Sequence, residues 1–167
     1  MVVDIGAATT KVYIVERGVV RFSHLINLGS QSLTLGISRA LGWNFDRAER
    51  AKREQGLLVR PGEDAQRDNQ VKEALLSTLG RIFSDVNRVL LSYEKKYGRN
   101  VSRIILAGGG AGLHGLSEYA GQNVSVDVER SNPFGRVQAP AFLEEVLVEV
   151  GPEFAVAIGM ALRRMQG

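Results

Sequence analysis

The feature that most constrains the fold is one long amphipathic segment, residues 69–97. Its apolar side chains recur every three or four residues and would form a single stripe along a helix. They are Val71, Leu75, Leu79, Ile82, Val86, Leu90, Tyr93 and Tyr97. Gly98 follows at once, which is typical of a helix C-terminus. Because this helix is long for a globular protein, we expect it to cross a boundary between subdomains.

Short strand patterns lie on both sides of the predicted helix. Before it, alternating apolar residues predict three antiparallel strands that form a β-meander, with a hairpin turn at residues 16–18. These strands cover residues 2–5, 11–15 and 19–28. The elements predicted after it are a strand at 103–107, a helix at 113–120, a strand at 124–128 and a last helix that starts at Pro152. This order predicts an α/β layer structure.

The stretch between the meander and the long helix has no strand pattern. Ser30 and Asp46 are predicted to cap two helices, which end at Gly42 and Gly56. The charged residues 57–67 are predicted to form an exposed loop. The expected division is therefore one subdomain of residues 1–29 and 69–167, with a helical insertion at residues 30–68.

Composition excludes several classes of protein. The net charge is only +3, and Lys and Arg are mixed with acidic residues, so no basic stripe indicates nucleic-acid binding. The chain has no cysteine, which excludes disulfides, cysteine nucleophiles and thiolate metal sites. No apolar run approaches the roughly 20 residues that span a bilayer, and the chain opens directly on a strand pattern rather than a signal peptide. We therefore expect a cytoplasmic protein.

The first segment with chemical content follows the first strand. Its candidate residues are Asp4, Gly6, Ala7, Thr9, Thr10 and Lys11. Small residues let the backbone of a hairpin approach a phosphate, and backbone N–H groups and threonine hydroxyls can bind phosphate oxygens. An aspartate at the strand end can hold a hydrated Mg²⁺ or orient an attacking water. An ordinary hairpin, with Asp4 bonded to turn amides, explains this segment about as well.

The second segment is a hydrophobic strand that runs into three glycines and then a helix. Gly108, Gly109 and Gly110 have no side chains, so a flat or charged ligand can lie on their backbone, and Leu113 begins the predicted helix. No Gly-Lys-Ser/Thr follows, so this is not a Walker motif. The predicted βαβ unit also lacks the acidic residue that a dinucleotide fingerprint requires.

The third segment is the helix that carries Glu49 and Lys52. These residues are three apart and lie on one helix face. They could bond ribose hydroxyls and an adenine edge. The alternative is a surface ion pair that contributes well under ~1 kcal/mol.

Taken in this order, the segments resemble the superfamily of sugar kinases, heat-shock chaperones and actin, which has a ribonuclease H-like ATPase fold. The hairpin from Asp4 to Thr10 looks like the second phosphate motif, and the turn from Leu106 to Gly110 looks like the adenosine motif. The Glu49/Lys52 helix is similar to the one that contacts ribose and adenine. Residues 155–161 look like the second connecting helix at the interdomain hinge.

Within that superfamily the chain resembles the PilM family of type IV pilus assembly proteins, a relative of the division protein FtsA. The likeness rests on short segments in the same order along nearly the whole chain. They are residues 3–10, 28–30, 48–56, 106–116, 132–134 and 155–163. An intact member would have a first actin-like domain before Met1, so we expect this chain to be the second half.

The resemblance implies ATP and Mg²⁺ as ligands. Asp4 would take the metal and water role, the hairpin residues would bind phosphate, and the glycine turn with Glu49 and Lys52 would hold the nucleoside. Nucleotide would act mainly as a conformational ligand, and any turnover would be slow. The implied partner is the cytoplasmic tail of a PilN-like inner-membrane protein, which would recruit the chain to the inner face of the membrane. Self-association stays open.

Three other interpretations also remain open. The chain could be the C-terminal half of a small-molecule kinase, although the helical insertion with Glu49 and Lys52 favours the actin and chaperone side. It could be an FtsA-like division protein, for which residues 162–167 are short as an amphipathic membrane anchor. It could also be a degenerate fold that binds protein and no nucleotide.

Overall fold

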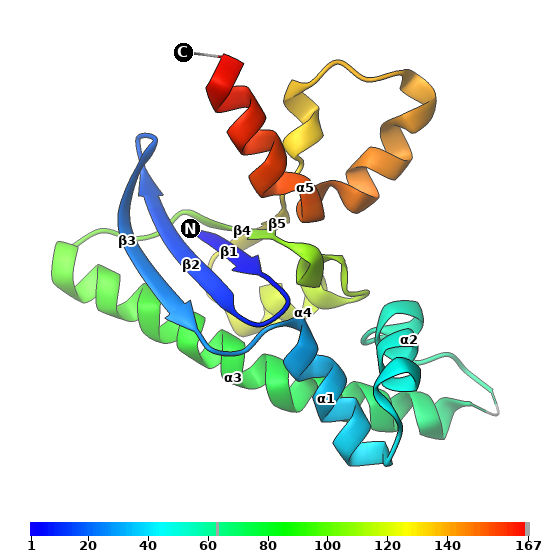
Figure 1. Cartoon of the computed structure of the whole chain (residues 1–167). Helices are drawn as coiled ribbons and strands as arrows, with labels where there is room; N and C mark the ends of the chain where they lie inside the picture. Colours follow the sequence, from blue (N-terminus) through cyan, green and yellow to red (C-terminus); the bar gives the residue numbers. More distant parts are fainter. Residues whose placement is uncertain (63, 166–167) are drawn as a thin grey trace.

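The computed structural model describes residues 1–62 and 64–165. Its centre is a mixed five-stranded sheet in the order β3-β2-β1-β4-β5 (Figure 1). The strands are β1 Val2–Ile5, β2 Thr10–Glu16, β3 Val19–Ile26, β4 Arg103–Ala107 and β5 Asp127–Arg130. Neighbours β1, β2 and β3 are antiparallel, which confirms the predicted meander. Strands β4 and β5 extend the sheet from β1 in parallel.

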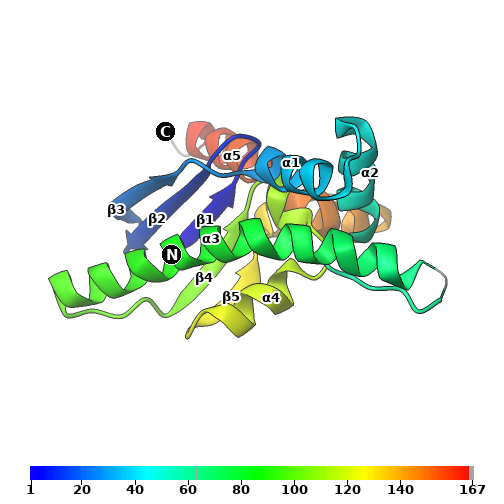
Figure 2. The ribbon, with the colours of Figure 1, turned by 90° about the horizontal axis from the view of Figure 1, so that it is seen from below.

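Helices cover both faces of this sheet. Helix α3, Ala65–Tyr97, runs along one face, and α5, Glu144–Met165, lies over the other (Figures 1 and 2). Helix α1, Ser30–Leu41, packs on α3 and on α2, Phe45–Gln55. The core lies between the sheet and α3 because the apolar stripe of α3 meets the inward-facing strand residues there. It includes Val3, Ile5, Val12, Ile104 and Leu106 from the sheet and Val71, Leu75, Leu79, Ile82 and Val86 from α3.

The ends of two helices and the turn of one hairpin lie at glycines, as predicted. Helices α1 and α3 end at Gly42 and Gly98, which adopt the left-handed conformation with φ of 67° and 61°. The β2–β3 hairpin turns at Arg17 and Gly18, with φ of 51° and 79°. Two successive residues with positive φ match the right-handed twist of the flanking strands.

The starts of three helices differ from the predictions. Gly29 rather than Ser30 is the N-cap of α1. Asn44, not Asp46, caps α2, because its side chain accepts a hydrogen bond from the Arg47 backbone N–H at 2.9 Å. Helix α3 begins at Ala65, four residues earlier than expected, so the predicted loop is shorter. Residue 63 lies outside the described residues.

The segment after β4 also departs from the prediction. Gly109–Gly112 forms a 3-10 turn, and α4, Leu116–Asn123, starts only after Gly115, whose φ is 79°. Strand β5 begins at Asp127 because it pairs in parallel with β4, which places Asp127 opposite Arg103. The glycine-rich turn is therefore longer than predicted, and both α4 and β5 begin later in the sequence than expected.

Pro152 does not start a helix, as the sequence suggested, but lies inside α5. Helix α5 changes direction along its length (Figure 1), and the proline explains this, because it has no N–H for the helical hydrogen bond and its ring crowds the preceding turn. Gly151 and Pro152 are buried, and the Pro152 carbonyl accepts a hydrogen bond from the Gly108 N–H at 2.8 Å. Two further short 3-10 turns, Pro133–Arg136 and Ala141–Leu143, precede α5. Residues 166 and 167 lie outside the described residues. They end both the predicted subdomain and the segment 162–167 that was weighed as a membrane anchor.

Candidate functional site

The two glycine-bearing turns emerge at the same edge of the sheet. They follow β1 and β4, which are parallel neighbours, and ligands of open α/β sheets bind at the carboxyl ends of such strands. Gly108 is pressed against β1: a Cβ at this position would stand 2.6 Å from the Ile5 carbonyl oxygen and closer still to a carboxylate oxygen of Asp4. A Cβ at Gly110 would collide with the Ile5 side chain. Packing alone therefore requires glycine at both positions.

A cavity of about 550 Å³ opens between the β1–β2 hairpin, the glycine turn, α2 and α5. It is lined by Gly6, Ala7, Ser30, Gln31, Leu33, Phe45, Glu49, Lys52, Arg53, Gly109, Gly110, Gly112, Leu113, His114, Glu149 and Glu153. Seven of the predicted site residues are among these, and they come from all three predicted segments. The structure thus brings the hairpin, the glycine turn and the Glu49/Lys52 helix to one shared space.

Gly109 differs from its two neighbours. The atoms nearest to a Cβ at Gly109 belong to Glu153 and lie 3.9 to 4.0 Å away, which is ordinary contact distance. Its φ is also outside the left-handed region. Neither packing nor backbone conformation therefore requires glycine here. The missing side chain leaves bare backbone facing the cavity, as a ligand that lies on the turn would need.

The hairpin is held in place by the start of α1. Its loop is closed by a hydrogen bond from the Gly6 N–H to the Thr9 carbonyl at 3.0 Å. The Ser30 and Gln31 N–H groups donate to the Gly6 and Ala7 carbonyls, both at 2.9 Å. These contacts satisfy two of the N–H groups that a helix N-terminus leaves free. The hairpin tip is therefore fixed rather than loose.

Other predicted hairpin residues are not among the cavity-lining residues. Thr10 is fully buried, and its hydroxyl donates to the Leu28 carbonyl at 2.8 Å, so its placement favours a structural role. Thr9 is half-buried in the loop. Lys11 is exposed and lies opposite Asp4 across the β1–β2 pair. Asp4 is half-buried next to Gly108, beside the cavity.

Glu49 and Lys52 form a largely buried network, not the surface ion pair that was the alternative. Lys52 is only 6% exposed. Its ammonium group donates to a Glu49 carboxylate oxygen at 2.8 Å, to the Ser30 hydroxyl at 2.7 Å and to the Thr34 hydroxyl at 3.0 Å. The network joins α2 to the beginning of α1, so it fixes one wall of the cavity.

The same contacts change the acidity of Glu49. Burial by itself would raise the pKa of this carboxyl group. Hydrogen bonds from Lys52, Thr34 and Arg53, with the Lys52 charge, outweigh burial and lower the pKa from 4.5 to about 2. Glu49 is therefore ionised throughout the physiological pH range.

Sequence reasoning missed several residues that line the cavity. Arg53 donates from Nε to the second Glu49 oxygen at 2.7 Å, yet its side chain is 77% exposed. The i,i+4 spacing from Glu49 was the signal that could have identified it. Phe45 is the first residue of α2, and His114 lies in the turn that precedes α4. Glu153 comes from α5, about a hundred residues farther along the chain than α2, and no local pattern indicates that approach.

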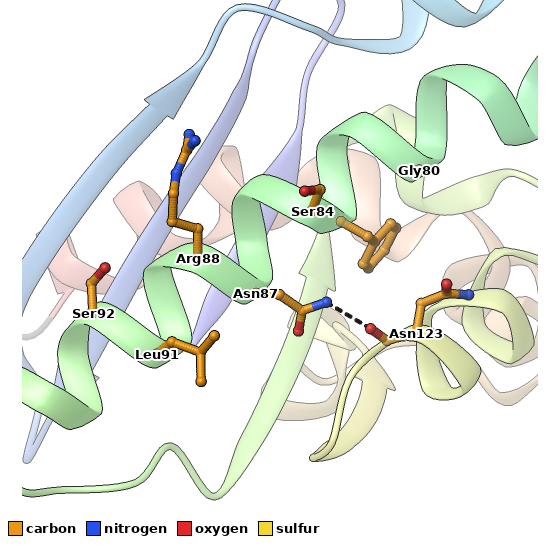
Figure 3. Close-up of a pocket in the computed structure, with 8 residues that line it drawn as sticks. Gly80, Ser84, Asn87, Arg88, Leu91, Ser92 and Asn123 are labelled. Carbon is orange, nitrogen blue, oxygen red and sulfur yellow. Dashed lines mark hydrogen bonds between the residues drawn. The ribbon is translucent and has the colours of Figure 1, made fainter.

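A second hollow, of about 520 Å³, lies between α3 and α4 (Figure 3). It is lined by Gly80, Phe83, Ser84, Asn87, Arg88, Leu91, Ser92 and Asn123. The Asn87 amide donates to the Asn123 carbonyl at 2.8 Å and links the two helices (Figure 3). None of the predicted site residues lines this hollow, so it is separate from the candidate site.

Comparison with known proteins identifies the family. A family model described as "Type IV pilus assembly protein PilM" matches residues 1–165. The chain belongs to the PilM family. A solved structure titled "PilM-PilN type IV pilus biogenesis complex" superimposes with a TM-score of 0.81 at 27% identity, over 97% of this chain and 44% of that chain. This PilM-family chain therefore spans less than half of that protein.

Two further matches are more distant in sequence. Cell division protein FtsA from Agrobacterium fabrum is 24% identical over 178 residues, which is 96% of this chain and 39% of the relative. MreB5 of Spiroplasma citri bound to AMPPNP superimposes with a TM-score of 0.69 at 16% identity, over 96% of this chain and 51% of that one, which shows the fold alone. The predicted actin-like α/β fold is confirmed. Within the described residues, no helix has the length and apolar character needed to cross a membrane.

Proposed function

We propose that this PilM-family chain is the nucleotide-binding half of an actin-like pilus assembly protein, with ATP and Mg²⁺ as its ligands. One observation carries the proposal. Two glycine-bearing turns from adjacent parallel strands meet α2 on a single cavity, and Gly109 leaves its backbone bare toward it. The cavity volume of about 550 Å³ is in the range of small-molecule sites.

The hairpin and the glycine turn would bind different parts of the nucleotide. The backbone of Gly6 and Ala7 would approach the phosphates, with Thr9 beside them. Thr10 would support the hairpin through the hydrogen bond from its hydroxyl to the Leu28 carbonyl. The bare backbone of Gly109, with the cavity-lining Gly110 beside it, would carry the part of the nucleotide next to the base, and Gly108, which packs against β1, would support the turn.

A Mg²⁺ ion would fit this arrangement if it bound together with the nucleotide, coordinated mainly by phosphate and water rather than by several protein ligands. The described residues contain no group of three or more acidic or histidine side chains that could hold a metal. Mg²⁺ commonly uses one or two carboxylates together with substrate phosphates and water. Asp4, beside Gly108 at the end of β1, would be the carboxylate. The ion would supply neutralisation of phosphate charge.

Helix α2 would form the wall around the nucleoside. The donors of Lys52 are already bonded to Glu49, Ser30 and Thr34, so Lys52 would shape this wall more than it would reach for the ligand. Arg53, held through Nε by Glu49, keeps the rest of its guanidinium group available on the cavity side.

In the whole protein, nucleotide would act mainly as a conformational ligand. This chain covers 44% of the PilM chain in the complex with PilN, so closure of the remaining part over the cavity would complete the site. The chain would be cytoplasmic. Its partner would be the cytoplasmic tail of a PilN-like inner-membrane protein, and binding to this tail would hold the chain at the inner face of the membrane. Any ATP turnover would be slow.

The test is isothermal titration calorimetry of Mg·ATP with the full-length protein and two alanine variants. Gly109→Ala places a methyl group in the cavity without a clash in the free protein, so we expect at least about a tenfold loss of affinity at unchanged melting temperature. Gly121→Ala, on α4 and in open space, is the matched control and should bind like wild type. Absence of binding heat for the wild-type protein would remove the proposed function. Wild-type affinity in Gly109→Ala would place the nucleotide elsewhere.

A further inference from the structure

The Glu49 carboxylate keeps one position at which it can accept a hydrogen bond from a ligand. Glu49 lines the cavity, and its side chain is 23% exposed. A carboxylate has about four acceptor positions. Within the described residues, three hydrogen bonds use them, from Thr34 and Lys52 to Oε2 and from Arg53 to Oε1. Because an ionised carboxylate can only accept, the ligand group that fits here is a hydroxyl rather than a phosphate.

Lys52 has no such capacity left. An ammonium group donates three hydrogen bonds. The Lys52 nitrogen lies 2.7 Å from the Ser30 hydroxyl, 2.8 Å from Glu49 Oε2 and 3.0 Å from the Thr34 hydroxyl. All its protons therefore have acceptors inside the protein. Of this ion pair, Glu49 is the member that can contact a ligand, and Lys52 holds it in place.

Thr34 connects the two charged groups from outside the cavity. It is fully buried in α1 and is not among the cavity-lining residues. Its hydroxyl accepts from Lys52 at 3.0 Å and donates to Glu49 Oε2 at 2.5 Å. The Ser30 carbonyl, 3.2 Å away, is the other acceptor for the same proton. Because a hydroxyl has a single proton, the closer and charged acceptor takes it. The hydroxyl thus fixes the direction in which the carboxylate faces.

We infer that Thr34 is a positioning residue for nucleoside recognition: its buried hydroxyl holds the Glu49 carboxylate in the orientation that accepts a hydrogen bond from a ribose hydroxyl. This inference rests on the proposed function and adds a residue that does not touch the ligand. Without the hydroxyl, Glu49 and Lys52 each lose a buried partner. The pair must then rearrange, because a charged group left without a hydrogen-bond partner in a buried site is costly. The free acceptor position of Glu49 then turns away from the ligand.

A purely structural role for Thr34 predicts a different result. Loss of the hydroxyl would then loosen the junction of α1 and α2 and weaken the binding of every adenine nucleotide by the same factor. ATP and 2′,3′-dideoxy-ATP share the base and the triphosphate and differ only in the ribose hydroxyls. The ratio of their affinities therefore separates the positioning role from the structural one.

The experiment measures binding of both nucleotides, with Mg²⁺, to the full-length protein by isothermal titration calorimetry. The proteins are wild type, Thr34→Val, Thr34→Ser and Thr78→Val. Thr78 is the matched control, because it lies on α3 beside Gly36 of α1 and outside the cavity lining. We expect wild type to bind ATP at least about tenfold more tightly than the dideoxy nucleotide. Thr34→Val should reduce this ratio to below about threefold, whereas Thr34→Ser and Thr78→Val should keep it within about twofold of the wild-type value.

Three results would overturn the inference while leaving nucleotide binding intact. The first is equal affinity of wild type for the two nucleotides, which decides the matter even if Thr34→Val does not fold. The second is a wild-type ratio in folded Thr34→Val. The third is loss of the ratio in Thr34→Ser at an unchanged melting temperature, since serine keeps the hydroxyl. If wild type bound neither nucleotide, the proposed function itself would fail, so the two failures are distinguishable.

Discussion

Replacing Gly29 with alanine tests the contact between α1 and the hairpin. Gly29 has an extended backbone with φ of −146°, so alanine meets no conformational obstacle there. A Cβ at this position would stand 2.6 Å from the Ala7 carbonyl oxygen and 2.7 Å from both the Gly6 carbonyl oxygen and the Thr9 nitrogen. All three are backbone atoms, which cannot rotate away. The start of α1 must therefore move off the hairpin in the variant.

The loss of stability can be worked out from these contacts. Displacing α1 breaks the hydrogen bonds from Ser30 and Gln31 to the hairpin carbonyls, and each such bond contributes about 1 kcal/mol. Strain from forcing a methyl group into a close-packed site adds about 1–3 kcal/mol. We therefore expect Gly29→Ala to lower the free energy of unfolding by about 3–5 kcal/mol, measured as a lower midpoint in urea with an unchanged slope.

Gly121→Ala is the control for this measurement. A Cβ at Gly121 meets no atom within 4 Å, and the residue lies inside α4. Alanine should stabilise the protein there by about 0.5–1 kcal/mol, because it has the higher helix propensity. A loss of under about 1 kcal/mol in Gly29→Ala would refute the close docking of α1 on the hairpin.

Two further changes test the network and the hairpin support. The pKa of Glu49 is lowered from 4.5 to about 2, so its contribution of about 3 kcal/mol is fully present above pH 4.5 and is lost as pH falls toward 2. Acid unfolding of Glu49→Gln should therefore show a weaker pH dependence than wild type in that window, and equal slopes would contradict the network. Thr10→Val removes the buried hydroxyl that donates to Leu28 and should cost about 1–3 kcal/mol in urea unfolding. Thr10→Ser should retain the hydrogen bond, and equal losses in both variants would assign the cost to packing instead.

Local rules predicted much of the fold. Strands β1 and β4 have the predicted bounds because each is an apolar run closed by glycine. Gly42 and Gly98 ended their helices because only a residue that tolerates positive φ fits there. The long helix α3 could be predicted from the period of its apolar stripe alone. These features depend on residues that are close together in the sequence.

The misplaced features depend on contacts between distant segments. Thr10 alternates with Lys11 along β2, and the sequence does not say which of them faces α3 and which faces solvent. The burial of Lys52 follows from the docking of α1, and the approach of Glu153 follows from the bend at Pro152. The candidate residues could thus be named from the sequence, whereas their division into lining and supporting roles required the structure.

The most direct test of the nucleotide site is hydrogen exchange of the full-length protein, followed by mass spectrometry, with and without Mg·ATP. We expect slower exchange in peptides that cover residues 6–10 and 108–113, since these peptides contain the residues of both turns that line the proposed cavity. Peptides at the α3–α4 hollow, residues 84–92, should exchange at the same rate in both conditions. Protection confined to other segments, or none at saturating Mg·ATP, would contradict the account.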